Sequence, residues 1–227
     1  MHQLPLGLRL DDRAVFETFW PAGNEQAVSH LRRAAAGEAG MTWLAGAAAS
    51  GKSHLLLAVC AAQPAGTAGY FQMAQLAALG PAALDGLPQL ACVCLDDIQV
   101  VAGQRPWELA LFSLYREVEE RGGALLAAAP QPPAQLQWSL PDLASRFAVA
   151  SVFRLHALTE EEQRQALMLR ARARGLELPE ETARWLQRRY PRDMGTLYHL
   201  LDTLDTAALA AQRRLTVPFI RQVLGEA

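Results

Sequence analysis

Residues 46–53 read GAAASGKS and match the phosphate-loop pattern G-x-x-x-x-G-K-[ST] at every fixed position. An apolar run typical of a buried strand precedes this loop, and an apolar run typical of a helix follows it. In that order of elements, glycines let backbone N–H groups turn towards phosphate oxygens at the positive end of the helix dipole. An ordinary small-residue turn is the alternative, but it gives no reason for Lys52. The pattern therefore predicts a P-loop in an α/β fold.

Lys52 is the only lysine among the 21 basic side chains of the chain. A solitary lysine indicates a place where a compact ammonium is needed and a planar guanidinium does not fit. We expect Lys52 to reach the outer phosphates of ADP or ATP, and the Ser53 hydroxyl to take a coordination position on Mg²⁺. The residues of this stretch expected to contact the nucleotide are Gly46, Ala49, Ser50, Gly51, Lys52, Ser53 and His54.

The composition limits the class of protein. Of the 227 residues 51% are hydrophobic and 19% charged, and the net charge is −2, which excludes a disordered chain and gives no excess of positive charge for bulk nucleic acid. The sequence has no membrane-length apolar run and no signal-peptide core near its start. We expect a soluble cytoplasmic protein in which Cys60, Cys92 and Cys94 are buried thiols, because their spacing fits neither a disulfide framework nor a zinc site.

Strand-like and helix-like runs alternate up to about residue 157, and only helix-like runs follow. The expected strands are residues 42–45, 69–72, 91–95, 124–128 and 151–155. A capping box at Thr159 and Glu162 opens the helical region. The pattern predicts an α/β fold, a P-loop parallel five-stranded sheet with helices on both faces plus a small C-terminal helical region. The expected domains are 1–12 as an extended peptide, 13–157 as the nucleotide-binding base and 158–227 as a helical lid.

A second nucleotide element is expected at residues 92–97 (CVCLDD), where four apolar strand residues end in two acids. Asp96 would hold Mg²⁺ from the carboxyl end of its strand, where ligands of open α/β sheets collect. Asp97, one position further, is a candidate for a catalytic base or a residue that positions water. Acids after a strand are also common turn residues, so the two acids indicate a Mg²⁺–nucleotide site only together with the P-loop that precedes them.

The chain resembles the DnaA-type AAA+ initiator family over nearly its whole length, and three stretches carry the resemblance. Residues 95–103 (LDDIQVVAG) resemble its DDIQ…AG stretch, residues 16–24 the linker before its nucleotide pocket, and residues 145–147 its SRF box. Residues 19–21, residues 140–146 and the leucine-rich start are specifically similar to the family's regulatory members, which inactivate the DnaA initiator. The resemblance implies an AAA+ fold. It ends before the duplex-binding domain of the initiators, so strong intrinsic binding to duplex DNA is not expected.

The resemblance also implies roles for single residues. Arg146 matches an arginine finger that acts across a subunit boundary on the neighbour's nucleotide, with an exposed helix-end arginine as the alternative. Arg192 matches the sensor-2 arginine, with a solvated helix-end arginine as the alternative. Phe19 and Asn24 lie in the linker stretch and are expected to contact the nucleotide.

The first residues of the chain resemble an extended peptide that docks on the DNA-polymerase sliding clamp. Alternating side chains of Gln3, Leu4, Leu6 and Leu8 would fill apolar pockets while the backbone runs extended. A loosely ordered terminus is the alternative.

Two departures from the family pattern weaken the case for fast ATP hydrolysis by this chain in cis. Residues 128–131 read AAPQ, where the family has a polar or acidic sensor-1 residue, and Asp97 is shorter than the Glu of strong motors.

Three interpretations of the function remain open. The first is a negative regulator of replication initiation with weak or no ATPase activity alone. Its partners would be the DnaA initiator and the clamp, and a homodimer or oligomer is left open. The second is a loader or initiator-like ATPase, and the third a P-loop kinase or scaffold. The near-neutral charge and the missing sensor-1 group favour the regulator.

Overall fold

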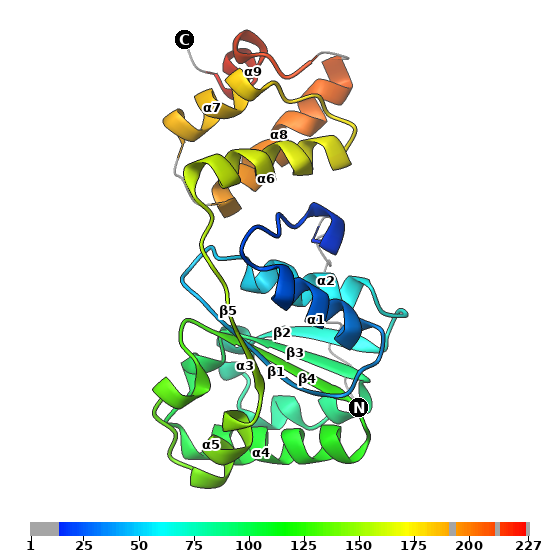
Figure 1. Cartoon of the computed structure of the whole chain (residues 1–227), viewed down its shortest axis with the longest axis vertical. Helices are drawn as coiled ribbons and strands as arrows, with labels where there is room; N and C mark the ends of the chain where they lie inside the picture. Colours follow the sequence, from blue (N-terminus) through cyan, green and yellow to red (C-terminus); the bar gives the residue numbers. More distant parts are fainter. Residues whose placement is uncertain (1–13, 191–193, 212–213, 226–227) are drawn as a thin grey trace. The chain divides into compact units, whose positions relative to one another are not determined.

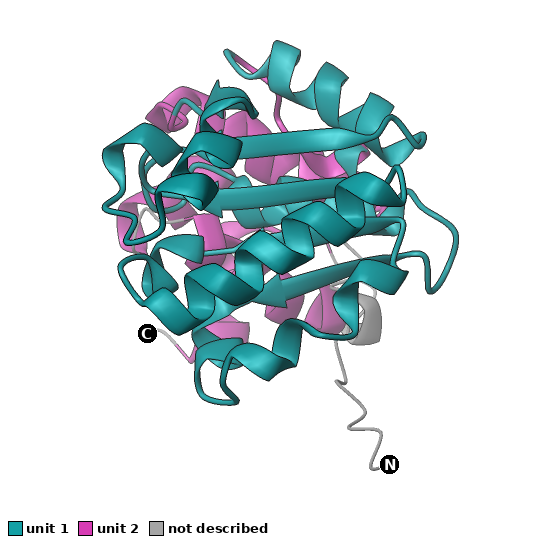
Figure 2. Cartoon of the chain, turned by 90° about the horizontal axis from the view of Figure 1, so that it is seen from below, with its two compact units in different colours: residues 1–16, 23–156 teal, residues 17–22, 157–227 magenta. Residues whose placement is uncertain are grey.

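The computed structural model describes residues 14–190, 194–211 and 214–225 and divides into two compact units. Unit 1 contains the described residues up to Phe16 together with Gly23–His156, and unit 2 contains Glu17–Ala22 and the described residues from Ala157 onward. Figure 1 shows the elements in chain order, and Figure 2 colours the two units separately.

Unit 1 is built on a five-stranded parallel sheet with the strand order β2-β3-β4-β1-β5, which confirms the predicted fold class. Strands β3 and β4 are buried along their whole length, and this explains their almost unbroken apolar sequences. The short edge strand β5 is mostly exposed. The strands are β1 (Gly40–Ala45), β2 (Ala68–Gln72), β3 (Cys92–Asp96), β4 (Ala124–Ala129) and β5 (Ser151–Arg154).

Helices cover both faces of this sheet (Figure 1). On one face lie α1 (Glu25–Ala35) and α2 (Lys52–Ala61), and Cys60 of α2 reaches Cys94 of β3 with 3.7 Å between the sulfur atoms. On the other face lie α3 (Met73–Ala77), α4 (Arg105–Glu120) and α5 (Pro141–Ala148), which share one hydrophobic core with the sheet. All three cysteines are free and buried.

Short 3₁₀ turns join several of these elements, and the sequence patterns did not predict them. Such turns contain too few residues for a helical period to be recognised. They are η1 (Phe16–Thr18), η2 (Pro81–Leu84), η3 (Leu87–Gln89), η4 (Ile98–Val101) and η5 (Pro133–Gln135).

Unit 2 is helical and has a hydrophobic core of its own, against which Trp20 packs. The predicted capping box is present, because the Thr159 hydroxyl accepts from the Glu162 N–H and the Glu162 carboxylate accepts from the Thr159 N–H. None of the helices in the described ranges combines the length and hydropathy that crossing a bilayer requires. The helices of unit 2 are α6 (Glu160–Ala173), α7 (Glu180–Arg189), α8 (Met194–Ala211) and α9 (Val217–Leu224).

Candidate functional site

The loop between β1 and α2 leaves no room for side chains at its first position. A Cβ atom added to Gly46 would lie 2.6 Å from the Ser50 Oγ and 3.1 Å from the backbone oxygen of Leu155. Ala49 and Gly51 both adopt positive φ angles, 60° and 92°. Since positive φ at a residue with a side chain costs about 1–2 kcal/mol, the chain keeps Ala49 in a strained conformation typical of ligand sites.

Lys52 lies at the first turn of α2 and is only 7% exposed. Its Nζ donates to the backbone oxygens of Gly46 and Ala47, both at 2.8 Å. Burial lowers the pKa of this ammonium, and the negative charges of Asp96 and Asp97 act in the opposite direction. The structure therefore holds the ammonium against the loop that the sequence predicts to bind phosphate.

The residues of this loop fit a Mg²⁺–nucleotide. Ser50 is 4% exposed, yet its Oγ has no hydrogen-bond partner within the described part of the chain. A buried hydroxyl without a partner inside a loop of backbone donors is a group that a phosphate oxygen would satisfy. The hydroxyl of Ser53 and the carboxylate of Asp96 are oxygen ligands of the kind Mg²⁺ prefers.

Asp96 ends β3 and is fully enclosed. Its Oδ2 accepts from the Ser53 Oγ at 2.5 Å and from the Tyr70 Oη at 2.7 Å, and its Oδ1 accepts from the Asp97 N–H at 3.0 Å. Burial, followed by the charge of Asp96 and the hydrogen bond to it, raises the pKa of Tyr70. The sequence analysis found Asp96 and Ser53 but missed Tyr70. Its position in a strand next to β3, two residues before the end of that strand, was the available signal.

Asp97 differs from its neighbour in being exposed. It adopts a positive φ of 56°, and the Gln99 Nε2 donates to its Oδ1 at 3.1 Å. Gln131, the polar residue of the stretch 128–131, is exposed, and its backbone oxygen accepts from the Trp43 indole at 2.9 Å.

Two of the predicted nucleotide contacts are hydrogen-bonded to backbone of unit 1. The His54 Nε2 lies 2.9 Å from the Val15 oxygen. The Asn24 side chain donates to the His156 oxygen at 3.3 Å and accepts from the His156 N–H at 2.9 Å. Within unit 1, these contacts hold Val15 against α2 and Asn24 against the segment that follows β5.

Six other predicted site residues lie outside the described part of unit 1. Phe19 belongs to unit 2. Arg192, Gln3, Leu4, Leu6 and Leu8 lie outside the described residues, and their roles stay predictions.

Arg146 lies in the last turn of α5, with half of its side chain (49%) exposed. Its Nη1 is 3.9 Å from the Glu119 Oε2, and its guanidinium carbon lies 5.8 Å from the centre of the Tyr115 ring. The Tyr115 Oη donates to the Glu119 Oε1 at 3.1 Å. Burial and the nearby Glu119 carboxylate raise the pKa of Tyr115.

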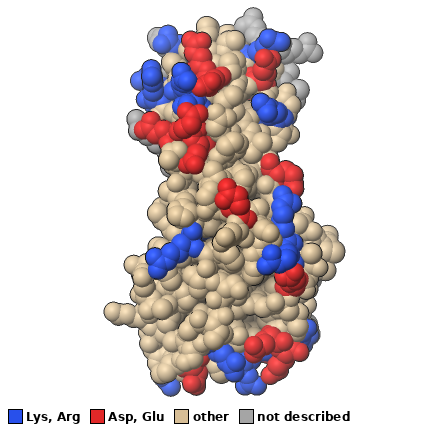
Figure 3. Space-filling view, viewed as in Figure 1, with Lys and Arg blue, Asp and Glu red and all other residues tan. Residues whose placement is uncertain are grey.

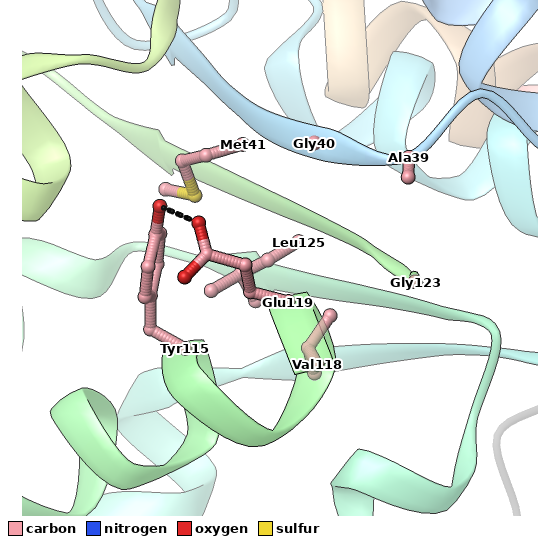
Figure 4. A pocket seen from close by; sticks show the side chains of 8 residues that line it. All are labelled: Ala39, Gly40, Met41, Tyr115, Val118, Glu119, Gly123 and Leu125. Atoms are coloured by element: carbon pink, nitrogen blue, oxygen red, sulfur yellow. Dashed lines mark hydrogen bonds between the residues drawn. The ribbon is translucent and has the colours of Figure 1, made fainter. Parts of the chain in front are cut away.

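Tyr115 and Glu119 also line a cavity of about 150 Å³ beside the start of β1 and β4 (Figure 4). Met41 and Leu125 supply apolar walls, and the dashed line in Figure 4 marks the Tyr115–Glu119 hydrogen bond. The other lining residues are Ala39, Gly40, Val118 and Gly123.

A phosphate loop after β1, an acid at the end of β3, a five-stranded parallel sheet and a helical unit after it together define an AAA+ P-loop protein. Residues 160–224 match the family described as Hda, lid domain. The helical region of the chain is thus similar to the Hda lid, and the likenesses given next show that the chain has the AAA+ fold of DnaA, as the sequence resemblance implied.

Solved structures show the same fold. Domain III of the Thermotoga maritima replication initiation protein DnaA has a TM-score of 0.74 and 20% identity, over 93% of this chain and 95% of that chain. AMPPCP-bound DnaA from Aquifex aeolicus has a TM-score of 0.69 and 18% identity over 86% of this chain. This chain spans 65% of that protein. The Thermotoga maritima RuvB Holliday junction branch migration motor has a TM-score of 0.62 and 16% identity, covering 89% and 69%.

Proposed function

We propose that this protein is a negative regulator of replication initiation. In this function it binds ADP or ATP with Mg²⁺, docks on the DNA-polymerase sliding clamp and promotes hydrolysis of DnaA-bound ATP through Arg146 acting in trans. The match of residues 160–224 to the Hda lid family supports the regulatory role. The free, buried cysteines are consistent with a reducing, cytoplasmic location.

The single observation that carries the proposal is the separation of the two cations within unit 1. Lys52 follows the carboxyl end of β1, whereas Arg146 contacts Glu119 beside the amino ends of β1 and β4. A six-residue strand spans roughly 17–20 Å. An arginine side chain does not bridge such a distance, so Arg146 is available to a nucleotide held by another subunit and not to its own loop.

The nucleotide would be held by this chain's own loop. Loop N–H groups, the Ser50 hydroxyl and Lys52 would bind phosphate oxygens, and Ser53 and Asp96 would hold Mg²⁺. Bound Mg²⁺ would neutralise phosphate charge. Hydrolysis in cis would be slow, because Asp97 is hydrogen-bonded to Gln99 and residues 128–131 supply no acid.

The catalytic role of Arg146 is tested with DnaA-bound ATP and DNA-loaded clamp. We expect the wild-type protein to accelerate hydrolysis and Arg146→Ala to remove about 10³-fold or more of that acceleration, the usual contribution of a finger arginine. The affinity for ADP should stay unchanged. Arg33→Ala is the matched control, because Arg33 is also half-exposed and ion-paired, with Glu38 at 3.0 Å. Undiminished acceleration by Arg146→Ala would exclude the finger role.

Clamp docking is tested by a pull-down of the clamp with the wild-type chain and with a chain that lacks residues 1–8. We expect the deletion to abolish capture and to leave the melting temperature unchanged. Retained capture contradicts the docking role. A large fall in melting temperature would instead assign these residues to the fold.

A further inference from the structure

The carboxylate of Asp96 has little capacity left for a metal or its waters. A carboxylate offers about four lone-pair positions. Two donors, the Ser53 and Tyr70 hydroxyls, fill both positions of Oδ2, and the Asp97 N–H fills one position of Oδ1. One acceptor position remains.

Two of these donors are compatible with a bound metal. The Ser53 hydroxyl can give its hydrogen to Asp96 while its oxygen lone pairs face a cation, and the Asp97 N–H belongs to the backbone that follows β3. Tyr70 is different, because its hydroxyl takes a lone pair that a water in the Mg²⁺ shell would otherwise use. Mg²⁺ keeps several waters in protein sites, and those waters need acceptors.

Tyr70 is held in this position. Its residue is 5% exposed, and it lies opposite Cys94 in the β2–β3 register, which places it two residues before the level of Asp96. The Gln72 Nε2 donates to its hydroxyl oxygen at 3.4 Å, so the hydroxyl hydrogen is left for the carboxylate. Because the ring is buried and its hydroxyl both donates to Asp96 and accepts from Gln72, moving Tyr70 aside would break two hydrogen bonds.

We infer that Tyr70 restricts Mg²⁺ at this site, so that the nucleotide is bound mainly by the loop amides and Lys52 and gains little affinity from the metal. The inference rests on the proposed nucleotide site and adds a specificity-determining residue to it. The occupancy of the nucleotide site would then be nearly independent of the concentration of free Mg²⁺.

The test is the affinity of the full-length protein for a fluorescent ADP, measured once with Mg²⁺ and once with EDTA. In the wild type the ratio of the two affinities should be below about tenfold. Tyr70→Phe should raise this ratio by about tenfold, the effect of one hydrogen bond to a charged group, with the affinity in EDTA unchanged. Tyr115→Phe is the matched control, because it removes another tyrosine hydroxyl that donates to a carboxylate, at the other end of the sheet.

An unchanged ratio in Tyr70→Phe would overturn the inference, and so would a lower ratio, which would mean that Tyr70 orients Asp96 for the metal. If the variant does not fold, the wild type decides alone. A loss of ADP affinity of more than about tenfold in EDTA would overturn the inference while leaving the proposed function intact. Failure of the wild type to bind ADP in either buffer would overturn the nucleotide site itself, and this inference with it.

Discussion

Lys52 and Arg146 are both cations that the proposed function sets against phosphate, yet unit 1 surrounds them very differently. The Lys52 ammonium is buried and bonded to two loop oxygens at 2.8 Å. The Arg146 guanidinium is half-exposed, and its ion-pair partner Glu119 lies 3.9 Å away. Charged side chains on the face shown in Figure 3 are of both signs and interspersed, so that face is not a general basic surface.

Under the proposed function, the first cation belongs to a site within this chain, and the second would complete a site on another subunit. The Lys52 ammonium donates to two loop oxygens, and the next residue, Ser53, donates to Asp96. At Arg146, an exposed ion pair contributes less than about 1 kcal/mol, so little free energy opposes transfer of the guanidinium to a better partner. A phosphate on another subunit is such a partner.

The largest expected effect breaks the comparison at Lys52. Lys52→Ala should lower ADP affinity on the order of 100-fold, because one or two charge-assisted hydrogen bonds to phosphate are lost. Isothermal titration calorimetry measures this change. Arg146→Ala is the control at the other end of the sheet and should leave ADP affinity unchanged. Equal losses in both variants would contradict the division of roles.

A smaller effect is expected at Gly46, where the loop has no space. Gly46→Ala places a Cβ 3.1 Å from the Leu155 oxygen, a backbone atom, so the loop or the segment after β5 must shift. We expect the free energy of unfolding to fall by about 1–3 kcal/mol, measured by denaturant unfolding. Gly86→Ala is the control, because a Cβ there meets nothing within 4 Å and the φ of −88° suits alanine. Equal stability of both variants would show that the loop yields without cost.

The same contrast explains what the sequence could predict. Lys52 and Ser53 belong to one contiguous motif, and Asp96 ends a buried strand, so local patterns were sufficient to find them. The alternation of five strands with helices along the chain could be predicted for the same reason, because each strand and each longer helix has its own hydrophobic period.

Tyr70 and Glu119 could not be found in this way. Tyr70 meets Asp96 only through the register of β2 against β3, and Glu119 meets Arg146 only where α4 packs on α5. Neither pairing leaves a repeat or a fixed spacing in the sequence. Tertiary structure decides both contacts, and the sequence offered at most a polar residue in an apolar strand and one glutamate among several on a helix.

The smallest expected effect sharpens the comparison at Arg146. Glu119→Gln keeps an acceptor for the Tyr115 hydroxyl but removes the charge that faces the guanidinium. We expect the acceleration of DnaA-bound ATP hydrolysis to fall less than about fivefold, because the pair is exposed. The kinetic assay at low and at high salt measures it. Glu120→Gln, which removes the partner of Arg116, is the control.

Salt decides what such a loss means. If Glu119 orients Arg146 through its charge, raising the ionic strength should lower the activity of the wild type towards that of Glu119→Gln, because exposed charges are screened. If Glu119 instead competes with phosphate for the guanidinium, Glu119→Gln should be faster than the wild type at low salt. The second outcome would mean that the Glu119 carboxylate holds the Arg146 guanidinium away from phosphate. Arg146 would then differ from Lys52 in having a competing partner within its own chain.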